Sequence, residues 1–63
     1  MIAYGIYYHL RNDETKHYDA LIDARDIKSA KRKIARKHKK KDGTPYKDGR
    51  VIVLERVDIV GYY

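Results

Sequence analysis

Eleven lysine and arginine side chains crowd residues 28–50, which hold only two aspartates. No acidic residue stands between Asp26 and Asp42. On an exposed helix, opposite charges four residues apart stabilise the fold, whereas like charges repel each other. A cationic helix without such compensation is typical of proteins that contact phosphate groups. The run therefore predicts a surface that binds a polyanion, and a solvated helix face is the alternative.

Nucleic acid, either DNA or RNA, is the polyanion that we expect. The candidate phosphate contacts are Lys28, Arg32, Lys33, Arg36, Lys37, Lys39, Lys40, Lys41, Lys47 and Arg50, with Lys31 adding flanking charge. Tyr46 stands beside Pro45 in what we expect to be a flexible basic loop, where its ring could stack on a base. A solvated connector is the slightly favoured interpretation of that loop. Gly43 and Gly49 do not have the spacing of a phosphate-binding loop.

Two histidines raise the possibility of a metal site. His9 and His17 fall opposite each other if residues 2–10 and 16–24 form a hairpin, and Asp19 lies two residues further along the same face. Two imidazoles and a carboxylate could bind a divalent metal. The spacing is generic and fixes no third ligand, so exposed cross-strand polar residues are the favoured interpretation. We therefore expect no metal and no cofactor. His38 is expected at the partly buried edge of a helix rather than as a ligand.

Catalytic chemistry has little support in the sequence. The chain has no cysteine and a single serine, Ser29, so no nucleophile stands beside a base in a familiar pattern. Asp13 and Glu14 lie in a polar turn, with no apolar pocket to shift their pKa values. A chain of 63 residues also leaves little room for a substrate cleft. We expect neither an enzyme nor a small-molecule substrate.

Two segments near the start alternate between apolar and polar residues, as strands do. Residues 2–10 and 16–24 are predicted to pair antiparallel across the turn between them. Pairing Leu10 with Lys16 sets Tyr8 against Tyr18, and both apolar sets then share one face. Seven tyrosines supply all of the aromatic bulk, so the core is expected to be thin with polar edges.

A helix, a loop and a third strand follow. The helix is predicted over residues 26–40, with Asp26 as its N-cap and with Ile27, Ala30, Ile34 and His38 as its apolar stripe. Residues 41–50 form the basic loop, and residues 51–60 form the last strand. A helical crossover returns the third strand antiparallel to the first. We thus predict a single α+β domain over residues 1–63, ordered β-β-α-β, with a three-stranded antiparallel sheet in order 2-1-3 and the helix packed on one face.

The third strand is apolar on both faces, although one helix can cover only one face of a sheet. A protein interface is therefore predicted on the bare face, and its candidate residues are Tyr7, Leu21, Ile52 and Leu54. We expect a homodimer or a complex with another protein through this face. The alternative is a bulge near Glu55–Arg56 that switches the facing of the second half of the strand.

The charge distribution and the absence of apolar runs limit the location and the partners. The net charge is +6, and residues 25–50 carry twelve basic and three acidic side chains, which indicates an anionic partner. No run approaches the roughly 20 apolar residues of a membrane span. The first residues are not typical of a secretory signal. We expect a cytoplasmic protein without a membrane partner.

The stretch "YDALIDARDIKSAKRKI", residues 18–34, consists of a strand that leads through Ala-x-Asp into a basic helix. It resembles short accessory proteins of phages and mobile elements. The resemblance implies either a small nucleic-acid binder or an inhibitor of a host or defence complex. Our first hypothesis is a non-enzymatic nucleic-acid-binding protein that contacts phosphates through its helix and loop. The alternative is a protein-binding module, such as a phage-type inhibitor, that acts through its bare sheet face or its basic helix.

Overall fold

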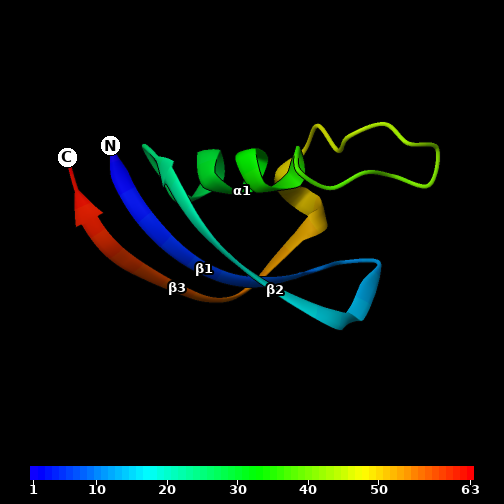
Figure 1. Cartoon of the computed structure of the whole chain (residues 1–63), viewed down its shortest axis with the longest axis horizontal. Helices are drawn as coiled ribbons and strands as arrows, with labels where there is room; N and C mark the ends of the chain where they lie inside the picture. Colours follow the sequence, from blue (N-terminus) through cyan, green and yellow to red (C-terminus); the bar gives the residue numbers. More distant parts are fainter.

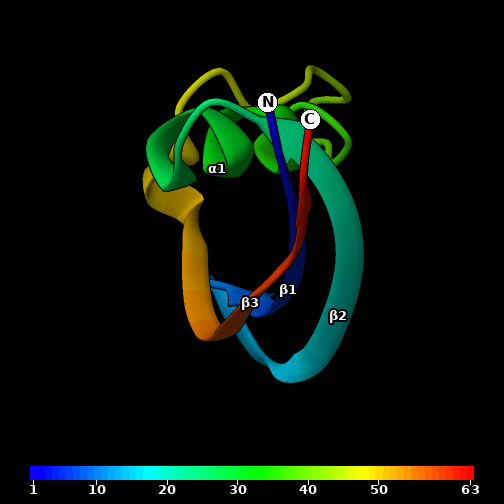
Figure 2. The same ribbon diagram turned by 90° about the vertical axis from the view of Figure 1, so that its left-hand side faces the viewer.

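A computed structural model describes all of residues 1–63 and has one antiparallel sheet with one α-helix. The elements are β1 (Ile2–Leu10), β2 (Asp13–Ala24), α1 (Ile27–Ala35), the short 3-10 helix η1 (Gly49–Val51) and β3 (Ile52–Tyr62). The strand order is β2-β1-β3, with both neighbours of β1 antiparallel to it. The predicted α+β fold, its β-β-α-β order and its 2-1-3 sheet are confirmed. Figures 1 and 2 show α1 on the concave side of the strongly curved sheet.

The β1–β2 hairpin has the predicted register over most of its length. Tyr8 pairs with Tyr18, and His9 pairs with His17. At the turn the prediction is wrong, because the register shifts after His9 and Leu10 pairs with Asp13 instead of Lys16. The Asp13 carboxylate accepts a hydrogen bond from the Thr15 backbone amide at 3.1 Å. Because Leu10 pairs with Asp13, β2 begins at residue 13 rather than 16.

The helix begins as predicted and ends early. Asp26 is the N-cap, and its carboxylate accepts a hydrogen bond from the Ser29 amide at 2.8 Å. The α-helix ends at Ala35, five residues before the predicted end. The amide of His38 then bonds to the Ala35 carbonyl at 3.1 Å, which is the tighter spacing of a 3-10 turn. The carbonyl of His38 accepts from the Tyr46 amide, so the chain turns into the following loop instead of continuing as a helix.

The core lies between the helix and the sheet. Its nine residues are Tyr4, Ile6, Tyr8, Ile22, Ala24, Ala30, Ile34, Ala35 and Ile52. Ile6, Ile34 and Ile52 are the largest side chains that are fully buried. The helical spacing of three and four residues therefore selected the correct buried face of α1.

A bulge in β3 switches which side chains of that strand face the helix beyond Glu55. Leu54 pairs with Tyr8 and Arg56 pairs with Tyr7, so Glu55 lies unpaired between them. Ile52 is buried in the core, and Leu54 packs against it. The prediction that these two residues line an interface on the bare face is wrong, because they share the helix-covered face with Tyr8. The bulge that we considered as the alternative is present.

Candidate nucleic-acid interface

The first turns of α1 and the segment at η1 form the two walls of a basic cleft. We use this name for the space of about 600 Å³ whose lining residues are Lys28, Lys31, Arg32, Lys47, Asp48, Gly49 and Arg50. Five of these residues are cationic, one is an aspartate, and none has an apolar side chain. Positive charge from two segments far apart in the sequence therefore converges on one concave surface.

A glycine brings the two walls together. Gly49 is buried, and a Cβ atom built on it would lie 2.8 Å from the Lys31 Cβ and 3.2 Å from the Arg32 backbone nitrogen. Real Cβ atoms essentially never approach another heavy atom to within 3.0 Å. The backbone at Gly49 thus packs directly on the second turn of α1, which no larger residue would allow without movement.

Side-chain and backbone hydrogen bonds set the orientation of the loop wall. The Asp48 carboxylate accepts from the Arg50 amide at 2.9 Å and caps η1. The same carboxylate lies 3.3 Å from Nε of Arg50, whose side chain is 90% exposed. This pair is weak because water surrounds it. An anion that enters the basic cleft can therefore compete with Asp48 for the Arg50 guanidinium.

Arg11 is a cationic neighbour that the sequence reasoning missed. Its amide donates to the Val51 carbonyl at 2.8 Å, and its Nε donates to the Arg50 carbonyl at 3.1 Å. Arg11 and Arg50 also line a shallow pocket next to the basic cleft. The only signal for this placement was the pairing of β1 with β3, which brings the β1–β2 turn beside η1.

The predicted contact residues divide between the basic cleft and other surfaces. The cleft contains Lys28, Arg32, Lys47 and Arg50 of the predicted set, together with Lys31. Lys33 lies elsewhere on the helix, where its Nζ donates to the Asp23 carbonyl. The other members, which are exposed outside the cleft, are Arg36, Lys37, Lys39, Lys40 and Lys41.

Residues 39–45, which the prediction divided between the end of the helix and the flexible basic loop, contain a small hairpin. Lys39 forms a bridge with Pro45, and the Lys40 amide bonds to the Thr44 carbonyl at 2.8 Å. The Gly43 amide bonds to the Lys40 carbonyl at 3.0 Å, and Gly43 has a φ of +89°, which glycine adopts without strain. Figure 1 shows this segment projecting beyond the end of α1. Lys39, Lys40 and Lys41 thus lie on a protrusion.

Tyr46 anchors this segment to the rest of the molecule. The residue is half-buried and packs against the core. Its hydroxyl accepts a hydrogen bond from Nδ2 of Asn12 at 3.0 Å, and Nζ of Lys40 lies 6.0 Å from its ring centroid. The ring therefore has a clear role in packing, and stacking on a base remains a prediction.

His38 forms a polar junction at the edge of the core. Its Nε2 lies 2.7 Å from the Tyr8 hydroxyl, and its ring packs edge-on against the rings of Tyr8 and Tyr18. Burial lowers the pKa of His38 below the usual 6.5, because desolvation penalises the imidazolium. Burial also raises the pKa of Tyr8. His38 is thus partly buried, as predicted, but it lies in the turn that follows α1 rather than on the helix itself.

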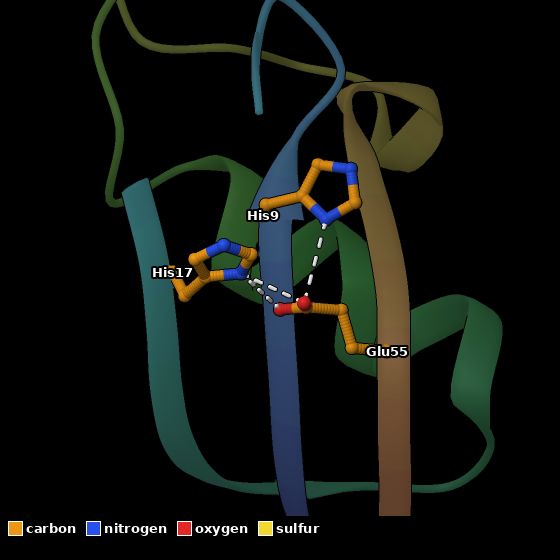
Figure 3. A group of neighbouring side chains, drawn as sticks. All are labelled: His9, His17 and Glu55. Atoms are coloured by element: carbon orange, nitrogen blue, oxygen red, sulfur yellow. Dashed lines mark hydrogen bonds and ion pairs between the residues drawn. The ribbon is translucent and has the colours of Figure 1, made fainter. Parts of the chain in front are cut away.

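The helix-free face carries a second cluster of polar side chains. His17 Nδ1 lies 2.7 Å from Oε1 of Glu55, and His9 Nδ1 lies 3.9 Å from the same oxygen. Figure 3 shows the three side chains meeting over β1. Asp19, the carboxylate that we had considered with the two histidines, is not part of this cluster.

Comparisons with known proteins add no relative: no family model matches the chain, and neither the curated proteins nor the solved structures contain a match. No helix has the length and apolar character needed to cross a membrane.

Proposed function

We propose that the protein binds nucleic acid, without a catalytic role, by holding the phosphate backbone in the basic cleft. The observation that carries the proposal is the convergence of five cationic side chains from two segments on a cleft without apolar lining. Like charges held close together repel one another, and an anion between them removes that repulsion. Phosphate oxygens accept hydrogen bonds from both arginine and lysine, and such charge-assisted bonds are strong.

The types of cation indicate how the backbone is held. Arg32 and Arg50 can each offer two parallel N–H groups to one phosphate, whereas Lys28 and Lys47 act as point charges. Contacts of this kind position a protein on a nucleic acid but carry no sequence information. The proposed binding is therefore independent of base sequence. The exposed cations outside the basic cleft steer the polyanion toward the cleft. We also propose that the protein is located in the cytoplasm.

Salt-dependent binding tests this proposal. Fluorescently labelled single-stranded and duplex DNA and RNA are titrated with the protein at several salt concentrations, and anisotropy reports binding. Four or five duplex phosphate contacts correspond to a log–log slope of about −4. Heparin serves as a competitor, because a general ion exchanger would bind it without preference for any nucleic-acid form. If none of the four nucleic acids binds at physiological salt, the proposal is excluded.

A second candidate function is self-association through the helix-free face. Leu21 is 73% exposed and Val60 is 63% exposed, and both line one shallow groove with Tyr7. Asp19 and Asp58 lie in the same groove, and Asp58 pairs with Arg56 at 3.1 Å. Apolar side chains with charges of both signs on one face can match a second copy related by a two-fold axis. We infer that the favoured assembly is a homodimer. The alternative is that the protein is an inhibitor that binds another protein through this same face.

A further inference from the structure

One residue from each strand contributes to a cluster on the helix-free face. His9 comes from β1, His17 from β2 and Glu55 from β3, and Figure 3 shows their side chains directed toward one another. One ligand atom from each residue can be chosen so that all three lie within 4.8 Å of one another. The cluster is separate from the basic cleft, which lies at α1 and η1.

The β3 bulge places the carboxylate in this cluster. Glu55 has no partner in the β1–β3 ladder, because Leu54 and Arg56 pair with consecutive residues of β1. Bulges re-aim a side chain at the expense of regular pairing, and they are frequent next to functional sites. Here the bulge directs Glu55 across β1, where its carboxylate lies 2.7 Å and 2.9 Å from His17 Nδ1.

His9 has a buried ring nitrogen without a bonding partner, which is an independent sign of a missing ligand. Its Nδ1 is shielded from solvent and makes no hydrogen bond, and it is the only buried side-chain nitrogen or oxygen atom of the chain in this condition. The 3.9 Å to Glu55 Oε1 is beyond hydrogen-bonding distance. Buried polar atoms almost always have a hydrogen-bond or metal partner. His9 Nδ1 faces a carboxylate and a second imidazole but has no such partner.

We propose that His9, His17 and Glu55 bind a divalent transition-metal ion of the zinc class. Two imidazole nitrogens and one carboxylate oxygen are a ligand set that such ions prefer, whereas calcium and magnesium favour oxygen ligands alone. Zinc bonds of about 2.0–2.2 Å place tetrahedral ligand atoms about 3.3 Å apart. The nitrogen–oxygen distances of 2.7 Å and 3.9 Å lie on either side of that value. The chosen ligand atoms lie within 4.8 Å of one another, so side-chain rotations that bring the most separated pair to the tetrahedral distance would complete the site. The metal would then give His9 Nδ1 its missing partner.

The exposure of the three residues suggests an open site. The side chain of His17 is 60% exposed, that of Glu55 is 33% exposed, and that of His9 is 18% exposed. Three protein ligands leave one tetrahedral position for water or for a group of a partner molecule. The alternative is a simple ion pair between protonated His17 and Glu55, which would leave His9 without a role.

The test uses the full chain without a histidine tag, after treatment with a chelator. Isothermal titration with Zn²⁺ should give saturable binding of one ion per chain, whereas Mg²⁺ and Ca²⁺ should give none. His17→Gln and Glu55→Gln should each abolish this binding. Asp19→Asn is the matched control, because it also removes one carboxylate from the helix-free face but lies outside the cluster, and it should bind like the original protein. Circular dichroism checks that each variant is folded.

Ring nitrogen signals in NMR spectra give a second readout. On addition of Zn²⁺ the signals of His9 and His17 should shift, while the signals of His38 should stay unchanged because it lies in the core edge on the opposite face of the sheet. The proposal is overturned if Glu55→Gln and His17→Gln bind Zn²⁺ as tightly as Asp19→Asn does. It is equally overturned if all three histidines respond alike, since that result indicates only adventitious binding to exposed imidazoles.

Discussion

Gly49 packs against Lys31 so closely that a Cβ atom on the glycine would lie 2.8 Å from the Lys31 Cβ. The two residues belong to opposite walls of the basic cleft, and this contact joins the walls. A segment that is remote in sequence thereby adds the charges of Lys47 and Arg50 to those of α1. The shape of the proposed phosphate site depends on a residue that carries no charge.

The first prediction follows from this contact. Gly49→Ala should push the loop away from α1 and destabilise the domain by about 1–3 kcal/mol, the usual range for overpacking. For a domain of this size, each kcal/mol lowers the Tm by roughly 4–8 °C. Nucleic-acid binding should also weaken although no charge is lost. Gly61→Ala is the control, because a Cβ there would meet nothing within 4 Å. Equal Tm values for the two variants would show that the walls are not in contact.

The second prediction concerns the core. Ile34 has no exposed surface and is one of the three largest fully buried side chains. Ile34→Ala should therefore lower the free energy of unfolding by roughly 2–5 kcal/mol, which is a large share of the stability of a small domain. Lys33→Ala changes the neighbouring exposed position and should have a much smaller effect. Chemical denaturation of both variants checks the prediction, and similar midpoints would mean that α1 packs on a different face.

The third prediction is a pH dependence of stability that arises at His38. Its pKa is lower in the folded protein than the ordinary 6.5 because burial disfavours the charged ring. The unfolded chain therefore takes up a proton first as the pH falls. The contribution of neutral His38 to stability should be complete above about pH 6.5. It should be lost as the pH falls from there through the folded-state pKa.

His38→Gln isolates this effect from the other titrating groups. The unfolding midpoint of the variant should fall less than that of the original protein between pH 7.5 and 5.5, values about one unit on either side of the ordinary histidine pKa. Parallel pH profiles for the two proteins would show that the pKa of His38 is the same in the folded and the unfolded chain, which would contradict this prediction.

The fourth prediction concerns assembly. Multi-angle light scattering should detect a dimer whose population rises with protein concentration, because the helix-free face exposes Leu21 and Val60. Leu21→Lys places a charge in the groove of that face and should shift the equilibrium to the monomer without unfolding the chain, because Leu21 is exposed. A strict monomer at high concentration would contradict the dimer and leave another protein as the partner for this face.

Alternation and helical spacing were sufficient for the hairpin register away from the turn and for the buried face of α1, and the helical crossover was sufficient for the sheet order. Tyr8 opposite Tyr18 and Ile34 in the core both follow from local periodicity. The end of α1 was not predictable in the same way. A long-range contact between His38 and Tyr8 and the return of Tyr46 to the His38 carbonyl draw the chain out of the helix.

The facing of β3 illustrates a second limit. Its sequence is apolar at both odd and even positions before Glu55, so alternation alone cannot choose between the two faces. The choice is made by pairing with β1, which sets Ile52 beside Leu10 on the helix-covered side. Both functional proposals depend on such long-range placements. The basic cleft needs Gly49 against α1, and the metal cluster needs Glu55 in a bulge.

The most direct test of the central claim compares Arg32→Gln with Arg36→Gln. Both arginines are exposed and each substitution removes one positive charge, but only Arg32 lines the basic cleft. If the basic cleft holds the phosphate backbone, Arg32→Gln should weaken binding and flatten the log–log salt dependence by about one unit. Arg36→Gln should leave the slope nearly unchanged. Equal losses in the two variants would show that the positive charge acts as a whole and that the basic cleft is not the binding site.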